Sequence, residues 1–209
     1  MLSDRELTSE KIAALQTFVS NNDILLMGIT GVGKTTLAEH MQRIVGLRYI
    51  SLGNITRAEI KYYRNAYVAE LMREGGVWPF EAVSGLLKPY IEISTPYVLD
   101  GIPKHEHEAE WLVKQASNRI WPMIAVILRV SVSTAENRRL ESLKYGQRPE
   151  TPDQIKDRID SFVKKEEILM QILSSVLGGV IELDVNGITP GNTVDILSEK
   201  LMLSGKANG

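Results

Sequence analysis

The sequence predicts a three-layer α/β fold in which a five-stranded parallel sheet lies between helices. Short apolar segments bounded by turn residues alternate along the chain with amphipathic segments of helical periodicity. No long structureless linker interrupts this alternation, and 209 residues suit one domain with insertions. We therefore expect an N-terminal helical extension over residues 1–22 and a single domain over residues 23–209.

Each element is predicted from its local pattern. Strands are expected where apolar residues run together, at residues 23–29, 48–51, 97–100, 123–130 and 180–185. Helices are expected where apolar residues recur at helical spacing, at residues 34–45, 54–74, 79–93, 105–119, 134–145, 152–177 and 192–203. Pro79 and Pro152 suit the first turn of a helix, where the missing N–H has no partner to lose.

The segment between the second and third strands is mostly helical and far longer than the dozen or so residues that a crossover needs. Ligands of α/β sheets bind beside the carboxyl ends of the strands. We therefore predict that an insert at about residues 52–93 forms a substrate-binding subdomain.

The composition excludes several classes of function. Lys and Arg total 24, Asp and Glu total 26, and the formal net charge is −2, which gives no electrostatic basis for binding nucleic acid or an anionic membrane. The absence of cysteine excludes disulfides, thiolate metal sites and a cysteine nucleophile. No segment approaches the roughly 18 consecutive apolar residues of a membrane span, and the N-terminus lacks the apolar core of a signal peptide. The expectation is a cytoplasmic monomer.

A glycine-rich segment, GITGVGKTT at residues 28–36, follows the first strand and precedes a helix. It fits the phosphate-binding pattern G-x-x-x-x-G-K-T, in which glycines let backbone N–H groups surround the phosphates of a nucleoside triphosphate. Lys34 is expected to reach the β- and γ-phosphates, and the Thr35 hydroxyl to ligate Mg²⁺. The sequence therefore predicts ATP and Mg²⁺ as cofactors.

Asp100 ends the third predicted strand and precedes Gly101. An acidic residue at such a strand end holds the metal, directly or through water, in proteins of this architecture. We predict that Asp100 joins Thr35 at the Mg²⁺ site. The alternative role is to cap the helix that follows.

From residue 50 onward the sequence resembles adenylate kinases and the wider nucleoside monophosphate kinase family. Four segments carry the resemblance, which runs from about Ile24 to about Leu201: ISLGNITRAEI (50–60), GGVWPFEAV (75–83), LDGIPKHEHEAEW (99–111) and RRLESLKYGQRPETPDQIKDRI (138–159). The last is similar to the short form of the family's lid, at about residues 140–153, and the helix after it.

The resemblance implies transfer of the γ-phosphoryl group of ATP to a nucleoside monophosphate. Such a reaction brings several negative charges together, so its site must be rich in cationic side chains. By resemblance, the catalytic residues are Lys34, Arg57, Lys104, Arg139, Arg148 and Arg158. ATP is expected to contact Gly28, Gly31, Val32, Gly33, Lys34, Thr35, Thr36 and Arg138. The acceptor is expected to contact Ser51, Gly53, Arg57, Val77, Trp78, Gly101, Lys104 and Glu108.

The chain departs from the family pattern on the acceptor side. Lys104 stands where the family has arginine, and it keeps the charge without the bidentate fork. Glu108 stands where adenylate kinases have a glutamine that reads adenine, and a carboxylate accepts from an amino group but donates nothing. Leu52 and Asn54 replace a small hydroxyl residue and an aspartate. The acceptor is therefore left open, with an amino-bearing base such as cytosine or adenine suited to Glu108.

Three other functions share the phosphate-binding loop. One is a kinase of a non-nucleotide small molecule, and another is a nucleotide-binding module that has lost phosphotransfer. The third is a signalling or AAA-type ATPase, which normally needs more chain for its sensor elements. The arginines of the acceptor and lid segments favour the nucleoside monophosphate kinase.

Overall fold

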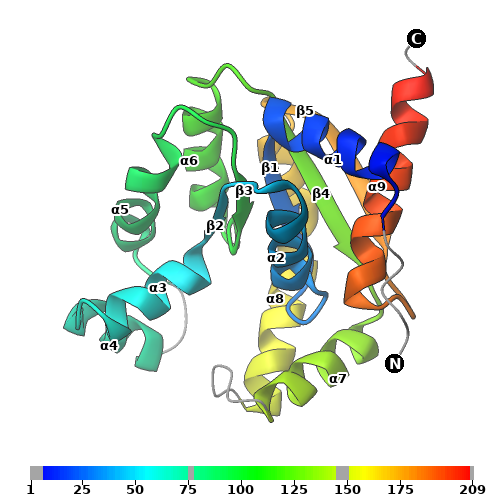
Figure 1. The fold of residues 1–209 in the computed structure, drawn as a ribbon. Coiled ribbons are helices and arrows are strands. Elements are labelled where there is room, and N and C mark those ends of the chain that lie inside the picture. Colours follow the sequence, from blue (N-terminus) through cyan, green and yellow to red (C-terminus); the bar gives the residue numbers. More distant parts are fainter. Residues whose placement is uncertain (1–6, 75–77, 145–150, 208–209) are drawn as a thin grey trace.

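The fold is that of a computed structural model, which describes residues 7–74, 78–144 and 151–207. Its five strands form one sheet in the order β2-β3-β1-β4-β5, and every neighbouring pair is parallel (Figure 1). The strands are β1 (Asp23–Met27), β2 (Tyr49–Ser51), β3 (Val98–Asp100), β4 (Met123–Arg129) and β5 (Leu177–Asp184). The predicted five-stranded parallel sheet is confirmed.

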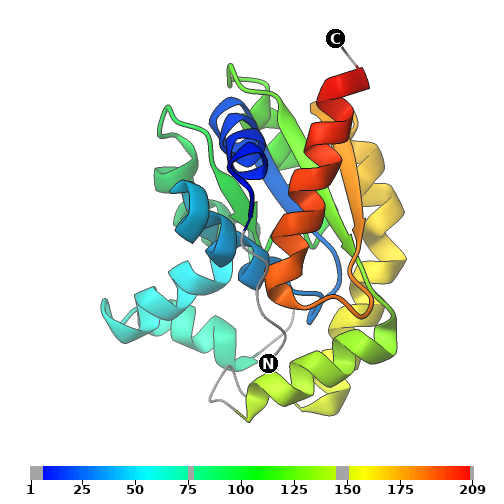
Figure 2. The same ribbon diagram turned by 45° about the vertical axis from the view of Figure 1, so that its right-hand side comes forward.

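Helices cover both faces of this sheet (Figures 1 and 2). They are α1 (Ser9–Asn21), α2 (Lys34–Val45), α3 (Leu52–Lys61), α4 (Ala66–Glu74), α5 (Phe80–Ile91), α6 (Glu106–Ala116), α7 (Val132–Leu143), α8 (Pro152–Leu173) and α9 (Pro190–Ala207). One apolar cluster joins the sheet to α1, α2 and α9, and a second joins it to α5, α6 and the end of α8. This is the predicted three-layer arrangement.

The alternation of side chains along β1 divides the core between these two clusters. Ile24 and Leu26 belong to the first cluster, whereas Leu25 and Met27 belong to the second. All five residues of β1 are buried, because a central parallel strand is covered on both faces. This explains why the strand is a continuous apolar run after Asp23, from Ile24 to Met27.

The helix predicted over residues 54–74 is in fact two helices. α3 ends at Lys61 and α4 begins at Ala66, and Arg64 between them has a φ of 52°. The Asn65 side chain accepts a hydrogen bond from the N–H of Val68 at 3.2 Å, which is the geometry of a helix cap. Asparagine favours such caps, so it was the signal in the sequence that marked the break.

The helix predicted to run to residue 177 also ends early. α8 stops at Leu173, and β5 begins at Leu177 rather than at residue 180. Gly178 and Gly179 fall in this strand, and glycine is among the weakest helix formers. The apolar residues around 176 were predicted to be helical because periodicity alone does not distinguish the end of a helix from an edge strand.

The N-terminal helix α1 packs against α9 and α2 (Figure 2). Thr8 caps it by accepting a hydrogen bond from the N–H of Lys11. Leu15 is fully buried, and Lys11 forms ion pairs with Asp195 at 2.5 Å and Glu199 at 2.7 Å on α9. The N-terminal extension therefore contributes to the first apolar cluster.

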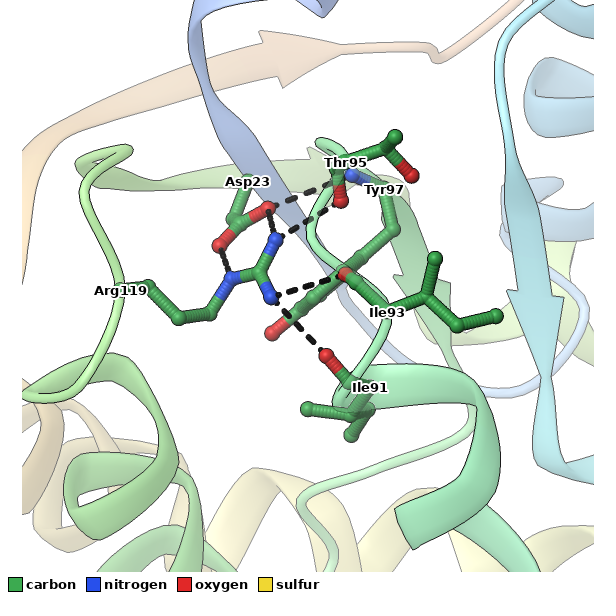
Figure 3. Close-up of polar contacts among 6 residues, drawn as sticks. All are labelled: Asp23, Ile91, Ile93, Thr95, Tyr97 and Arg119. Carbon is green, nitrogen blue, oxygen red and sulfur yellow. Dashed lines mark hydrogen bonds and ion pairs between the residues drawn. The ribbon is translucent and has the colours of Figure 1, made fainter.

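A polar cluster lies at the amino-terminal edge of the sheet, on the opposite side from the strand ends that α/β proteins use for ligands (Figure 3). The Arg119 guanidinium is paired with the carboxylate of Asp23, the first residue of β1. It also donates to the carbonyls of Ile91, Ile93 and Thr95, at 2.8–3.3 Å, in the connection from α5 to β3. One side chain thus ties the end of the insert to the sheet.

In the part of the chain that the structure describes, no helix combines the length and apolarity needed to cross a membrane.

Candidate active site

The glycine-rich loop joins β1 to α2, and its glycines have backbone angles that other residues rarely adopt. The φ values of Gly28, Gly31 and Gly33 are 130°, 82° and 109°. A Cβ on Gly28 would lie 2.6 Å from the carbonyl oxygen of Leu128, and one on Gly31 would overlap the carbonyl of Ala135. Sterics as well as backbone angle therefore require glycine at both positions.

Lys34 begins α2, and its ammonium group is folded back over the loop. The Nζ atom donates to the carbonyl oxygens of Gly28 at 2.6 Å and Ile29 at 3.0 Å. Burial lowers the pKa of Lys34 and the charge of Asp100 opposes that shift, while Arg158 and Lys104 lower the pKa further. Three other residues that the sequence assigned to the site, each from a separate element or loop, therefore lie within electrostatic reach of Lys34.

Asp100 ends β3 beside β1 and is 5% exposed. The Thr35 hydroxyl, from the first turn of α2, donates to Asp100 Oδ2 at 3.0 Å. The Tyr49 hydroxyl, from β2, donates to the same oxygen at 3.1 Å. The structure thus brings together the two predicted metal ligands and adds a tyrosine that no motif in the sequence marked.

On the acceptor side, the start of α3 is built from Ser51 to Arg57. Ser51 caps this helix, since its hydroxyl accepts a hydrogen bond from the N–H of Asn54 at 3.3 Å. Arg57 donates to the Asn54 side chain, and a Cβ on Gly53 would lie 3.3 Å from Arg57 Nη1. The guanidinium therefore lies along the helix start in this structure.

The backbone after β3 approaches this helix start closely. Gly101 has a φ of 98°, and a Cβ there would lie 3.3 Å from Cβ of Leu52. Trp78 packs at the edge of the second apolar cluster. Val77, the other residue predicted to contact the acceptor through its backbone, lies outside the described residues.

Glu108 is held against the backbone in the first turn of α6. It is 3% exposed, and its Oε2 accepts a hydrogen bond from the N–H of Lys104 at 2.5 Å. The contact closes the loop that carries Lys104 onto the helix. Recognition of a base by Glu108 would need this carboxylate to become accessible.

The arginines of the lid segment have different surroundings. Arg138 on α7 donates to the carbonyl oxygens of Val32 at 3.3 Å, Val185 at 3.1 Å and Ile188 at 3.0 Å, which links the phosphate-binding loop to the loop after β5. Arg139 donates to the Ser142 hydroxyl at 3.0 Å. Arg148 and most of the predicted lid lie outside the described residues.

A family model described as "AAA domain" matches residues 27–156, which is more than half of the chain. The chain belongs to the AAA domain family. The matched region includes the phosphate-binding loop, Asp100 and the segments predicted as the insert and the lid. The assignment to the P-loop class, first predicted from residues 28–36, is thereby confirmed.

Individual relatives of this AAA domain protein are adenylate kinases. The adenylate kinase of Oenococcus oeni is 27% identical over 175 residues, which cover 80% of this chain and 91% of the relative. The adenylate kinase of Prochlorococcus marinus is 26% identical, over 71% of this chain and 82% of the relative. Adenylate kinase isoenzyme 1 of Bos taurus is 24% identical, over 69% of this chain and 76% of the relative. The resemblance to the adenylate kinase and nucleoside monophosphate kinase family is therefore confirmed.

The chemistry of the Thr35 and Asp100 side chains fits a magnesium ion. Both offer oxygen atoms, which Mg²⁺ prefers, and their hydrogen bond shows that they lie side by side. In the described residues of this AAA domain protein, no group of three or more His, Asp or Glu is arranged to hold a metal. An ion here would therefore take its remaining ligands from phosphate oxygens and water.

Proposed function

We propose that the protein transfers the γ-phosphoryl group of ATP to a nucleoside monophosphate, with Mg²⁺ as cofactor. The observation that supports this best is the convergence of Asp100, Lys104 and Arg158 around Lys34. A phosphate-binding loop alone needs only its own lysine. Additional cations, one from the loop after β3 and one from α8, suit a site where two phosphorylated substrates meet.

On the donor side, the backbone N–H groups of the loop and the Lys34 ammonium bind the phosphates of ATP. Lys34 now donates to two loop carbonyls, and phosphate oxygens would take over these hydrogen bonds. Thr35 and Asp100 would hold Mg²⁺, which would supply positive charge against the phosphates. Positioning and charge stabilisation account for catalysis, so no side-chain nucleophile is needed.

On the acceptor side, Arg57 and Lys104 bind the phosphate of the monophosphate. Arg57 needs only to exchange its bond to Asn54 for one to phosphate. Arg158, and Arg139 and Arg148 in the lid segment, stabilise the transferred group. The lid would exclude water, so that hydrolysis does not compete with transfer.

For the base of the acceptor, the proposal rests on the chemistry of Glu108. A carboxylate accepts hydrogen bonds, so a base with an exocyclic amino group suits it. Glu108→Gln is expected to change the order of preference among monophosphates. An unchanged order would show that Glu108 serves only to hold the N–H of Lys104.

The decisive experiment measures ADP formation from Mg-ATP with AMP, CMP, UMP, GMP and dTMP each offered as acceptor, beside a control without acceptor. We expect stimulation by one or two of them, in a monomeric, cytoplasmic enzyme. ATP binding without stimulation by any monophosphate would contradict the proposal. It would favour a kinase of a non-nucleotide small molecule or a nucleotide-binding module.

A further inference from the structure

The Asp100 carboxylate is held by hydroxyl groups from two different elements. Thr35 in α2 and Tyr49 in β2 both donate to Oδ2, at 3.0 Å and 3.1 Å. β2 pairs with β3 so that Ser51 lies opposite Asp100, which places Tyr49 two residues back along the neighbouring strand. Tyr49 packs on the same apolar cluster as α2, so its hydroxyl reaches the carboxylate along the α2 face of the sheet.

The Tyr49 hydroxyl can only be a donor in this contact. A tyrosine phenol has an ordinary pKa of about 10. The phenol thus keeps its proton at physiological pH. Since Asp100 is a carboxylate with lone pairs only, the proton of Tyr49 points at Oδ2.

These two bonds make the oxygens of Asp100 unequal. Oδ2 accepts both hydroxyl protons, whereas Oδ1 accepts no hydrogen bond from any residue that the structure describes. Thr35 can donate its proton to Oδ2 and still offer an oxygen lone pair to a metal. The Tyr49 hydroxyl is hydrogen-bonded to Asp100, so its effect on a bound metal would pass through that carboxylate.

We propose that Tyr49 is a positioning residue for the metal site. Its hydroxyl orients the Asp100 carboxylate so that Oδ1 faces Mg²⁺, or a water bound to it, beside the Thr35 hydroxyl. This inference rests on one part of the proposed function, the metal site formed by Thr35 and Asp100. It does not depend on which acceptor is used. Partners of this kind, one step removed from the metal, are worth about 10–100-fold in metal affinity or activity.

Tyr49→Phe isolates the hydroxyl, because the ring packs against the first apolar cluster and phenylalanine keeps that packing. Tyr63→Phe is the matched control, since Tyr63 is 74% exposed and lies in the break between α3 and α4. Circular dichroism establishes that each variant is folded. If Tyr49→Phe does not fold, Tyr49→Leu removes the same donor and carries the same expectation.

The test uses Mn²⁺ as a paramagnetic probe of the metal site in the protein saturated with ATP. Electron paramagnetic resonance of free Mn²⁺ measures its dissociation constant from the protein–ATP complex. We expect about 10-fold weaker binding in Tyr49→Phe and no change in Tyr63→Phe. Binding of ATP alone, measured by calorimetry in the presence of EDTA, is expected to be equal in all three proteins.

An Mn²⁺ dissociation constant for Tyr49→Phe equal to that of the wild type would overturn the proposal. A loss of ATP affinity in EDTA as large as the loss of Mn²⁺ affinity in Tyr49→Phe would also overturn it, because that would show general damage to the site. Phosphoryl transfer at graded Mg²⁺ separates this result from the proposed function. If the protein transfers phosphate to no monophosphate but Tyr49→Phe still weakens Mn²⁺ binding, the proposed kinase activity is refuted and the role of Tyr49 is supported.

Discussion

The side chains of Asp23 and Arg119 form an ion pair that is almost completely removed from solvent, with exposed fractions of 1% and 8% (Figure 3). The Arg119 guanidinium also lies 4.7 Å from the centre of the Tyr97 ring and 5.1 Å from that of Trp121. With its three carbonyl contacts, this arginine joins β1 to the end of α5 and to the segment that leads into β3. It thereby anchors the insert that carries the proposed acceptor site.

Arg119→Met should destabilise the fold by about 3–5 kcal/mol, because it leaves the Asp23 carboxylate buried without its partner. Urea denaturation followed by circular dichroism measures this change. A loss below about 1 kcal/mol would mean that the cluster admits enough water to solvate Asp23.

Arg48→Met is the contrasting variant in the same cluster. The Arg48 guanidinium lies 5.5 Å from the Tyr97 ring centre, and its three nitrogens are buried without a hydrogen-bond partner in the described part of the chain. Burial lowers the pKa of Arg48, the charge of Arg119 lowers it further, and the charge of Asp23 opposes the shift. Replacement by an apolar side chain is therefore expected to leave stability unchanged or raise it. A loss as large as that of Arg119→Met would contradict this reading.

Gly31→Ala is expected to abolish ATP binding. The added Cβ would overlap the carbonyl of Ala135, and the φ of 82° is unfavourable for alanine. Gly85→Ala in α5 is the control, because its Cβ meets no atom within 4 Å and alanine favours the helix by about 0.5–1 kcal/mol. Calorimetric titration with ATP and the thermal midpoint of each variant test the pair. Normal ATP affinity in Gly31→Ala would show that the loop tolerates a shift.

Lys34→Met is expected to lower phosphoryl transfer by about 10³-fold or more, as for other cations on the transferred phosphate. The ammonium group is the one cation of the loop itself. Lys114→Met, on the exposed face of α6, is the matched control and should retain activity. Turnover is measured as ADP formation with the preferred acceptor. Near-normal turnover in Lys34→Met would refute the role of the loop.

His105 makes stability depend on pH. Burial, reinforced by the charge of Lys165, lowers the pKa of His105 to about 4, and its Nδ1 lies 2.9 Å from Lys165 Nζ. His107 and Lys104 shift the pKa in the same direction. The unfolded chain therefore takes up a proton below its ordinary pKa of 6.5, whereas the folded protein takes it up only near pH 4.

The stability that neutral His105 contributes is thus complete above pH 6.5 and is lost as the pH falls toward 4. We expect a loss of roughly 1–2 kcal/mol, since His105 is only partly buried. Urea denaturation of the wild type and of His105→Gln at pH 7 and pH 5 measures it. The wild type should lose more stability than the variant, and equal losses would show that His105 titrates normally.

Part of the candidate site could be read from the sequence because it is local. The pattern of glycines, lysine and threonine over residues 28–36 specifies backbone angles and donors within one turn. Asp100 was found because a strand end next to the loop is a general place for an acidic ligand. The sequence also contains signals for the two helix ends that were predicted wrongly. Asn65 is a capping residue, and Gly178 is a weak helix former. The prediction missed these ends because it followed helical periodicity.

Local sequence patterns were enough to predict the alternation of strands and helices, the phosphate-binding loop and the acid at the end of β3. These follow from periodicity and from short motifs, which act over a few residues. Tertiary structure alone decided that Tyr49 reaches Asp100, that Arg119 pairs with Asp23, and that α1 packs on α9. These partners are 51, 96 and up to 188 residues apart. Such contacts depend on which strands become neighbours, and hydrophobic periodicity, which sets the faces of a strand or helix, does not specify the order of strands in a sheet.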